Sequence, residues 1–199
     1  YTALRARMDP WLTQQAVDLG VLIVTKTNVT ARLKDEKGRV IGVSTDRPEG
    51  DIYAPVVVIA EGVNNLLTQK LGLISHDLPP QYVALSVKQY IGIPTKDLQA
   101  RFNLSGPDEG AAIDIFGDAT LGLPGLAYLY TDKAGVSIGI GLLLSEFVTR
   151  NIKPYEVLAR FKQHPVIKPY LEGGEPLEYG AHLIPETGYD GMPKLMADG

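Results

Sequence analysis

The sequence contains no cysteine, which excludes disulfides, thiolate zinc sites and cysteine-ligated iron–sulfur clusters from these 199 residues. It also lacks an apolar run near the ~20 residues that a membrane helix needs, because the longest, 54–60 and 138–144, are far shorter. No basic excess is present: 19 Lys and Arg face 23 Asp and Glu, a net charge of -4. That balance argues against a nucleic-acid partner, and peripheral contact with a membrane stays open.

What the chain does contain is typical of a folded protein, with 45% apolar and 21% charged residues. Its length predicts one or two domains of roughly 100–150 residues. The first residues, 1–5, show no charged-then-apolar leader pattern. We therefore expect the chain to be an internal piece of a longer protein.

Residues 1–50 predict a helix followed by a β-hairpin. Asp9 has the character of an N-cap and Pro10 of a first helical residue, while Gly20 is a suitable stop. A short strand is expected at 21–24. Two further strands, 29–33 and 39–43, are expected to pair around a turn that ends in a glycine.

A strand, a turn and a helix are predicted next. Residues 52–60 are apolar at successive positions, which is typical of a strand buried on both faces of a parallel sheet. Glu61 and Gly62 form the turn, and 66–71 has helical spacing closed by Gly72. We expect the first N–H groups of this helix to be free to hold an anion.

After 79 the pattern becomes antiparallel β. Strands are expected at 82–91, 111–116, 125–130 and 136–144, with a tight turn at 132–135 between the last two. A helix over 154–163 is predicted to bury Val157, Leu158 and Phe161. The remaining residues, 161–199, are too irregular for a simple helix or strand.

Two candidate sites lie in the first half. Glu61 can accept a hydrogen bond from a ribityl or ribose hydroxyl, and Gly62 lets a cofactor approach the backbone closely. The alternative is an ordinary strand-to-helix turn. Arg5 can meet a phosphate at the start of the first helix, and its alternative is a solvated arginine paired with Asp9.

A third candidate is Tyr179-Gly180-Ala181-His182, whose small and aromatic residues can line a flat redox ring. The alternative is a bent strand whose glycine relieves crowding. His164 is expected to end a helix in its charged form, which suits the helix dipole. The histidines show no metal-ligand spacing, so no metal site is predicted.

Several segments resemble the electron-transfer-flavoprotein–quinone oxidoreductases, most closely the FixC-type members. The segments are LRARMDPWLTQQA (4–16), VVVIAEGVNNLLTQKLGL (56–73) and the series HP, EGG, EYGAH and PE between 164 and 186. The AEG turn is shared with other flavoproteins, whereas the later series is more specific to this family. The resemblance covers nearly the whole chain.

The resemblance implies an α/β (α+β) fragment of the FAD-dependent hydroxylase-like fold. Residues 1–78 would form part of an FAD-binding domain, 79–175 an antiparallel β substrate or quinone domain, and 176–199 a segment returning toward the flavin. It assigns Arg5, Val29, Glu61 and Gly62 to FAD binding. Tyr179, Gly180, Ala181 and His182 would lie on the quinone and flavin side, and His182 would assist quinone protonation.

The function implied is transfer of electrons from reduced electron-transfer flavoprotein, through FAD, to a membrane quinone, in support of nitrogen fixation. A separate ferredoxin-like protein would be a further partner, the iron–sulfur cluster would lie outside these residues, and the protein would be cytoplasmic and peripheral on the inner membrane face. Alone, this piece would bind FAD weakly or not at all and be inactive. Two rivals are a geranylgeranyl-reductase-like or aromatic-hydroxylase-like FAD enzyme and a binding module without catalysis.

Overall fold

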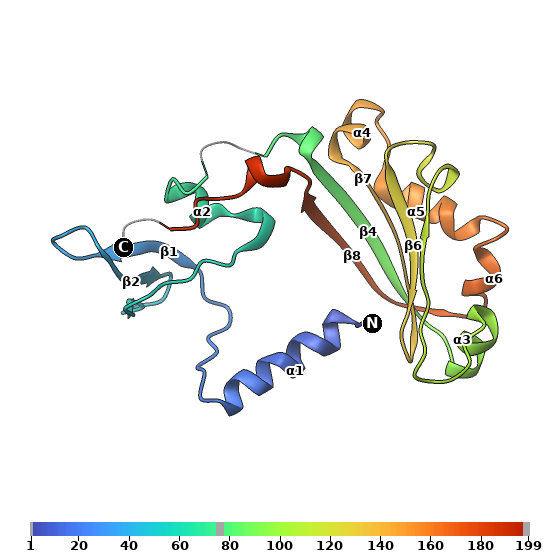
Figure 1. Cartoon of the computed structure of the whole chain (residues 1–199), viewed down its shortest axis with the longest axis horizontal. Helices are drawn as coiled ribbons and strands as arrows, with labels where there is room; N and C mark the ends of the chain where they lie inside the picture. Colours follow the sequence, from blue (N-terminus) through green and yellow to red (C-terminus); the bar gives the residue numbers. More distant parts are fainter. Residues whose placement is uncertain (1, 75–77, 197–199) are drawn as a thin grey trace. The chain divides into compact units, whose positions relative to one another are not determined.

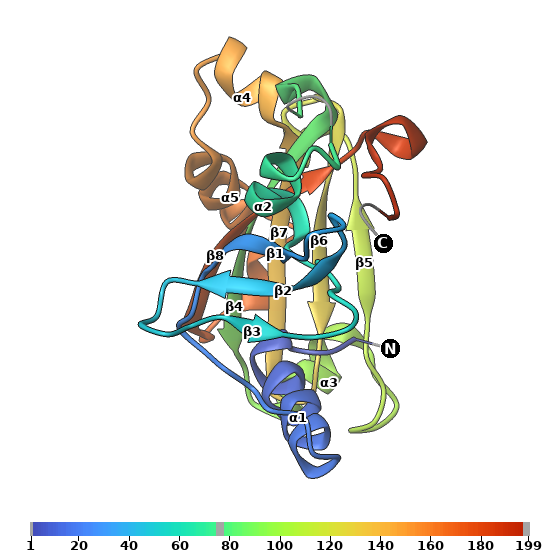
Figure 2. The same ribbon diagram turned by 90° about the vertical axis from the view of Figure 1, so that its left-hand side faces the viewer.

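The computed structural model describes residues 2–74 and 78–196 and is drawn in two views (Figure 1, Figure 2). Contacts divide the chain into two compact units. Unit 1 holds residues 1–10 and 79–186, and unit 2 holds 11–78 and 187–199. The predicted domains also include residues 1, 75–77 and 197–199, which lie outside the described residues.

Unit 1 is built on a five-stranded antiparallel sheet with the order β5-β6-β7-β4-β8. Its strands are β4 (Val83–Gly92), β5 (Ala112–Ile115), β6 (Gly125–Thr131), β7 (Gly135–Leu143) and β8 (Glu175–Pro185). The four strands predicted before residue 145 are confirmed, with ends shifted by at most one residue. Strand β4 lies between β7 and the edge strand β8, so Val87 has Ile140 of β7 on one side and Ala181 of β8 on the other.

The α-helices of the described chain that lie wholly within unit 1 are α3 (Thr95–Phe102), α4 (Leu144–Thr149), α5 (Pro154–Gln163) and α6 (Lys168–Leu171). Figure 1 shows α4 and α5 on one side of β4 and β7, the strands that they contact. The predicted helix 154–163 is confirmed, and it buries Val157, Leu158 and Phe161. Sequence reasoning missed α3, α4 and α6.

Strand β7 shows why the sheet has two different faces. Every second residue is a fully buried apolar one: Val136, Ile138, Ile140 and Leu142. The residues between them are small, namely Ser137, Gly139 and Gly141. Because successive side chains point to opposite faces, the large residues pack under the helices. The small ones lie on the other face, with Tyr90, Tyr128 and Tyr130 of the neighbouring strands, and we call it the tyrosine face.

Unit 2 contains a small antiparallel sheet in the order β1-β2-β3: β1 (Val29–Lys34), β2 (Val40–Thr45) and β3 (Ile52–Tyr53). The predicted hairpin is confirmed. Gly38 has φ 81°, and the Asp35 carboxylate accepts N–H bonds from Lys37 and Arg39 across the turn. Helix α2 (Leu66–Lys70) follows, and the N–H of Lys194 donates to the Leu73 carbonyl at 2.8 Å.

The prediction of a buried strand over 52–60 is wrong. Only Ile52 and Tyr53 pair, and Val56 and Val58 are 74% and 84% exposed. A strand covered on both faces needs parallel neighbours and helices above and below. Residues 2–74 and 78–196 provide no parallel strand beside this run. The strand expected at 21–24 is wrong too, because that segment belongs to no sheet of the described chain.

Helix α1 (Arg5–Asp18) begins four residues before the predicted N-cap. Pro10 lies inside it, and Asp9 is a helical residue whose carboxylate pairs with Arg5. Its last residue is Asp18, and Gly20, the predicted stop, has φ 87°. The N–H groups of Gly20 and Val21 donate to Val17 and Ala16, a Schellman motif.

The expectation that 161–199 forms no simple strand is also wrong, because 175–185 is the eleven-residue strand β8. It lies at the edge of the sheet and is exposed along much of its length, so it lacks the apolar alternation that marks a half-buried strand. Its pairing with β4 sets its course.

Candidate functional site

The tyrosine face of unit 1 combines phenols with bare backbone. In one row, Tyr128 of β6 lies opposite Gly139 of β7, which lies opposite Lys88 of β4 and then Gly180 of β8. A Cβ at Gly139 would stand 2.4 Å from the Tyr128 ring, so the ring occupies the space that a side chain would take. At Gly180 the nearest atom to such a Cβ is the end of Lys88, at 3.7 Å. The backbone of this row is therefore open at Gly180 and covered by the Tyr128 ring at Gly139.

That wall is held by a network of hydrogen bonds and ring contacts. Tyr128 and Tyr130 stack with ring centroids 4.7 Å apart and planes 22° from parallel. The Tyr130 hydroxyl donates to Asp114 at 2.6 Å, and the Tyr90 hydroxyl donates to Asp132 at 2.8 Å. These bonds fix the orientation of two of the phenols.

The same surroundings keep the phenols protonated. The hydrogen bond to Asp114, with burial, raises the pKa of Tyr130 to about 12. Burial, followed by the Asp132 hydrogen bond, raises the pKa of Tyr90. Burial also raises the pKa of Tyr128, against a smaller opposite effect of its hydrogen bond with Ser86. The tyrosine face thus presents neutral phenols at neutral pH.

Register divides the predicted cluster on β8. Gly180 and His182 lie opposite Lys88 and Ser86, so they belong to the tyrosine face. Tyr179 and Ala181 alternate with them and belong to the helix-covered face. The four residues therefore cannot contact one ring together, although the pair Gly180 and His182 lies on the face that carries the phenols. Their role toward a flavin or quinone stays a prediction.

Arg5 adopts the arrangement given as the alternative to phosphate binding. Its Nε donates to the Asp9 carboxylate at 2.6 Å on an exposed helix turn, and this contact holds the pKa of Asp9 below its usual range. A phosphate would have to share the Arg5 guanidinium with the Asp9 carboxylate or displace that carboxylate. A flavin contact at Arg5 stays a prediction.

Glu61 caps α2 from outside the helix. Its carboxylate accepts the N–H of Leu67 at 2.8 Å, and both the N–H and the hydroxyl of Thr68 at 2.7 Å. Burial acts to raise the pKa of Glu61, but the three hydrogen bonds outweigh it and lower the pKa. The prediction that these N–H groups are free for an external anion is wrong, since Glu61 itself is the anion they hold.

The turn still fits a cofactor hydroxyl. A carboxylate has about four acceptor positions, and Glu61 uses three of them while remaining exposed. Gly62 has φ 70°, and nothing lies within 4 Å of where its Cβ would stand, so its backbone is open to close approach. Val29, the first residue of β1, is 42% exposed and pairs with Thr45.

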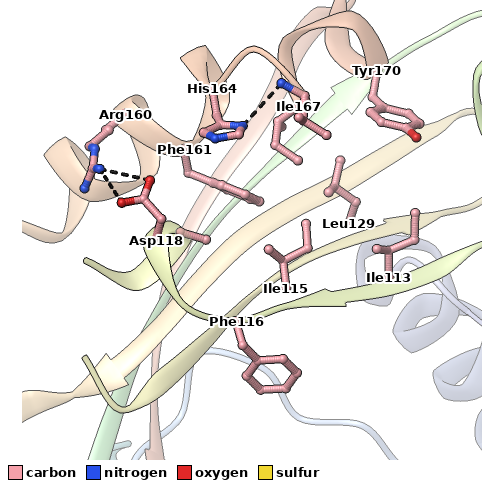
Figure 3. Close-up of a pocket in the computed structure, with 12 residues that line it drawn as sticks. Ile113, Ile115, Phe116, Asp118, Leu129, Arg160, Phe161, His164, Ile167 and Tyr170 are labelled. Atoms are coloured by element: carbon pink, nitrogen blue, oxygen red, sulfur yellow. Dashed lines mark hydrogen bonds and ion pairs between the residues drawn. The ribbon is translucent and has the colours of Figure 1, made fainter. Parts of the chain in front are cut away.

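Sequence reasoning missed an apolar pocket on the other side of the same sheet (Figure 3). It has a volume of about 380 Å³ and lies between β5 and β6 on one side and α5 and α6 on the other. The lining residues are Ile113, Ile115, Phe116, Asp118, Ala119, Leu129, Arg160, Phe161, His164, Val166, Ile167 and Tyr170. Its residues come from segments up to 57 positions apart, so no local motif marks it.

Few polar groups line this pocket. One guanidinium nitrogen of Arg160 donates to both carboxylate oxygens of Asp118, at 2.8 and 3.0 Å. The Nδ1 of His164 accepts the N–H of Val166 at 3.2 Å. With Nδ1 accepting this hydrogen bond, Nε2 is the ring nitrogen left to face other groups.

Comparison with known proteins gives one family model and many relatives. Residues 120–184 match the model described as "ETF-QO, ubiquinone-binding". Protein FixC from Azorhizobium caulinodans is 44% identical over all of this chain and 45% of its own length. A probable electron transfer flavoprotein-quinone oxidoreductase from Escherichia coli, YdiS, is 38% identical with the same coverage. The chain thus spans a little under half the length of the curated relatives it matches.

Solved structures resemble it in fold. A geranylgeranyl bacteriochlorophyll reductase-like protein from Thermoplasma acidophilum matches with TM-score 0.69 and 18% identity, over 91% of this chain and 42% of that one. The flavin-dependent brominase Bmp2 matches with TM-score 0.67 and 16% identity, over 92% and 44%. These likenesses confirm the expected mixed α and β fold of flavin-dependent enzymes. None of the described helices is long and apolar enough to cross a membrane.

Proposed function

Since this chain is homologous over its whole length to part of the FixC-type electron-transfer-flavoprotein–quinone oxidoreductases, we propose that the whole protein passes electrons from reduced electron-transfer flavoprotein through FAD to a quinone. One observation carries this proposal above others. The ubiquinone-binding model covers residues 120–184, from five residues before the start of β6 to within one residue of the end of β8. Those residues build most of both faces of the unit 1 sheet.

Bound FAD would supply the redox chemistry, by which two electrons and two protons convert a quinone to a quinol. In unit 2, Glu61 would use its remaining acceptor position for a cofactor hydroxyl, Gly62 would permit close approach, and the backbone of Val29 would add an adenine-side contact. In unit 1, Arg5 would exchange Asp9 for a phosphate.

The tyrosine face would serve the redox ring. The backbone at Gly141 and Gly180 leaves room for a flat group, whereas the Tyr128 ring covers Gly139. The Tyr90 and Tyr130 hydroxyls already donate to Asp132 and Asp114, so Tyr128 is the phenol of the three that would donate a hydrogen bond to a carbonyl oxygen. On β8, Gly180 would let a ring approach the backbone and His182 would give a proton to a quinone oxygen. Tyr179 and Ala181 would act only from the opposite face.

Finer parts of the proposal rest on the family resemblance. These are support of nitrogen fixation, a separate ferredoxin-like partner with the iron–sulfur cluster outside this chain, and peripheral attachment to the inner membrane face from the cytoplasm. The absence of cysteine agrees with a cluster held elsewhere.

The test is turnover by the full-length protein loaded with FAD. Reduced electron-transfer flavoprotein should drive reduction of a short-tail quinone. The reaction is measured as the loss of quinone absorbance. No reduction under these conditions would reject the proposal. Reduction of an isoprenoid or aromatic compound by a nicotinamide cofactor, without the flavoprotein donor, would instead favour the reductase or hydroxylase rival.

A further inference from the structure

We propose that the ammonium of Lys88 stabilises the negative charge of the reduced flavin ring and thereby raises the potential at which FAD accepts electrons. This inference rests on the proposed function, because it takes the tyrosine face as the surface that meets the ring. It goes beyond that function by naming the side chain that makes the cofactor a stronger electron acceptor.

Register places Lys88 of β4 in the middle of the tyrosine face, between Gly139 of β7 and Gly180 of β8. A Cβ at Gly180 would stand 3.7 Å from the Cε of Lys88, which is the nearest heavy atom. The lysine stem therefore runs toward the β8 backbone, at the place where that backbone is open. The Lys88 side chain is 30% exposed, so a group that lies on the face can reach its ammonium.

Lys88 supplies the positive charge of this face. Among the strand residues of the face that the structure describes, it is the only lysine or arginine. One further cation acts from α1, because the charge of Arg7 opposes the rise in the pKa of Tyr90. The carboxylates of Asp114 and Asp132 already accept hydrogen bonds from phenols. An anionic ring on the face would therefore find Lys88 as its nearest strand-borne counter-charge.

The ion pair of Lys88 leaves its ammonium available. In the described part of the chain, the carboxylate within 4 Å is that of Glu178 on β8, and Nζ and Oε1 are 3.7 Å apart, too far for a hydrogen bond. No described residue accepts a hydrogen bond from this ammonium, so its three N–H groups can bind another acceptor. Glu178 is 40% exposed, and ion pairs of such exposure contribute little to stability.

The chemistry of reduction calls for a cation. When the flavoprotein donor gives two electrons and the solvent gives one proton, the proton binds N5 and the flavin ring gains one negative charge, spread over N1 and the neighbouring carbonyl. The phenols of the face are neutral and cannot balance that charge. An opposite charge within ~4–6 Å favours a charged form by one to three factors of ten. Charge beside the ring is a recognised means by which a protein tunes its cofactor.

The experiment measures the two-electron potential of FAD in the full-length protein at pH 7, by stepwise chemical reduction beside a reference dye. Lys88→Met removes the charge and keeps a long side chain. It should lower the equilibrium constant for reduction at least tenfold, a fall of ~30 mV for a two-electron couple. Lys88→Arg keeps the charge and should restore most of that loss. Lys153→Met is the matched control, because Lys153 forms a similar pair with Glu156, 3.9 Å long, at the start of α5, and the potential should not change.

Glu178→Gln separates an electrostatic role of Lys88 from a structural one. Loss of the Glu178 charge leaves Lys88 less neutralised, so the equilibrium constant for reduction should rise, opposite in sign to the effect of Lys88→Met. An ion pair that only supports the sheet predicts lower thermal stability of both variants and no shift of the potential in either. Because Glu178→Gln keeps the lysine, it decides the question even where Lys88→Met fails to hold FAD.

The outcomes separate this role from the proposed function, since the titration uses a chemical reductant and needs neither donor nor quinone. Any pair of shifts other than a fall in Lys88→Met and a rise in Glu178→Gln would overturn the proposal, as would an equal fall in Lys153→Met. Such a result in a protein that reduces quinone with electrons from the flavoprotein donor would keep the function. The expected shifts in a protein without that turnover would reject the function and keep the role of Lys88.

Discussion

Replacing Gly139 with alanine tests whether the glycine on β7 exists to accommodate the Tyr128 ring. The added Cβ would stand 2.4 Å from Cζ and the hydroxyl oxygen of Tyr128, closer than real contacts allow. The ring must therefore move away from its place over the strand. Gly141→Ala is the matched control, two residues along the same face, where the only heavy atom within 4 Å is the Cβ of Ser86 at 3.9 Å.

The magnitude follows from what the ring loses. Displacing Tyr128 gives up its stacking on Tyr130, about 0.5–1.5 kcal/mol, and its hydrogen bond with Ser86, about 0.5–1.5 kcal/mol. Alanine in a strand is favoured over glycine by about 0.5–1 kcal/mol, and both variants receive that gain. We therefore expect Gly139→Ala to be about 1–3 kcal/mol less stable than Gly141→Ala.

The assay is urea unfolding of both variants and the unchanged chain. With a slope of ~2 kcal/mol per molar urea, the midpoints of the two variants should differ by roughly 0.5–1.5 M. Spectrophotometric titration should also show an easier ionisation of Tyr128 in Gly139→Ala, because the ring loses the burial that raises its pKa. Equal stability of Gly139→Ala and Gly141→Ala would refute the claim that Gly139 is needed to make room for the Tyr128 ring.

Three further predictions concern a cap, a phenol and the core. Glu61→Ala should destabilise unit 2 by about 1 kcal/mol, since it removes the acceptor for α2 on an exposed turn. Folding lowers the pKa of Glu61, so its contribution to the free energy of unfolding is complete above the ordinary glutamate pKa. The contribution is lost as pH falls through the lower pKa of the folded state. Unfolding curves from pH 7 to pH 3 should show this loss in the unchanged chain and not in Glu61→Ala. Tyr130 should ionise at a pKa of about 12, and Asp114→Asn should bring that pKa back toward ~10. The stabilisation from the Tyr130–Asp114 hydrogen bond is therefore complete below the ordinary tyrosine pKa and is lost as pH rises through the pKa of the folded state. Identical absorbance of the unchanged chain and Asp114→Asn at alkaline pH would contradict the assignment of the raised pKa to Asp114. Phe161→Ala should cost about 3–5 kcal/mol of unfolding free energy, whereas Tyr155→Ala on the exposed side of α5 should cost under about 0.5 kcal/mol, as measured by thermal unfolding.

Local patterns in the sequence predicted the elements that depend on local interactions. Pro154 at a first helical position and the apolar spacing of Val157, Leu158 and Phe161 predicted α5, and Gly38 predicted the turn of the β1–β2 hairpin. These features depend on backbone preferences and on contacts a few residues apart. Their formation does not depend on contacts with distant parts of the chain.

Long-range contacts explain what the sequence did not predict. Strand β8 is exposed on both faces and is defined by its ladder with β4, about ninety residues earlier. The apolar run at 52–60 has the composition of a buried strand but no parallel partner in the described chain. The face assignment of Tyr179 and His182 also depends on register, which no short motif reveals. The turn at Glu61 was predicted at the correct place. Its side chain, however, accepts hydrogen bonds from the N–H groups of Leu67 and Thr68, which the sequence did not reveal.

The β4–β8 pairing has a consequence for synthesis in the cell. Val83 of β4 pairs with Pro185 of β8, so this second partner of β4 is translated about a hundred residues after it. At ~5–20 residues per second, the ribosome takes roughly 5–20 s to add that stretch. During this interval one side of β4 offers unpaired N–H and C=O groups to any other extended chain. A nascent chain that pauses before β8 should therefore be the form most dependent on chaperones.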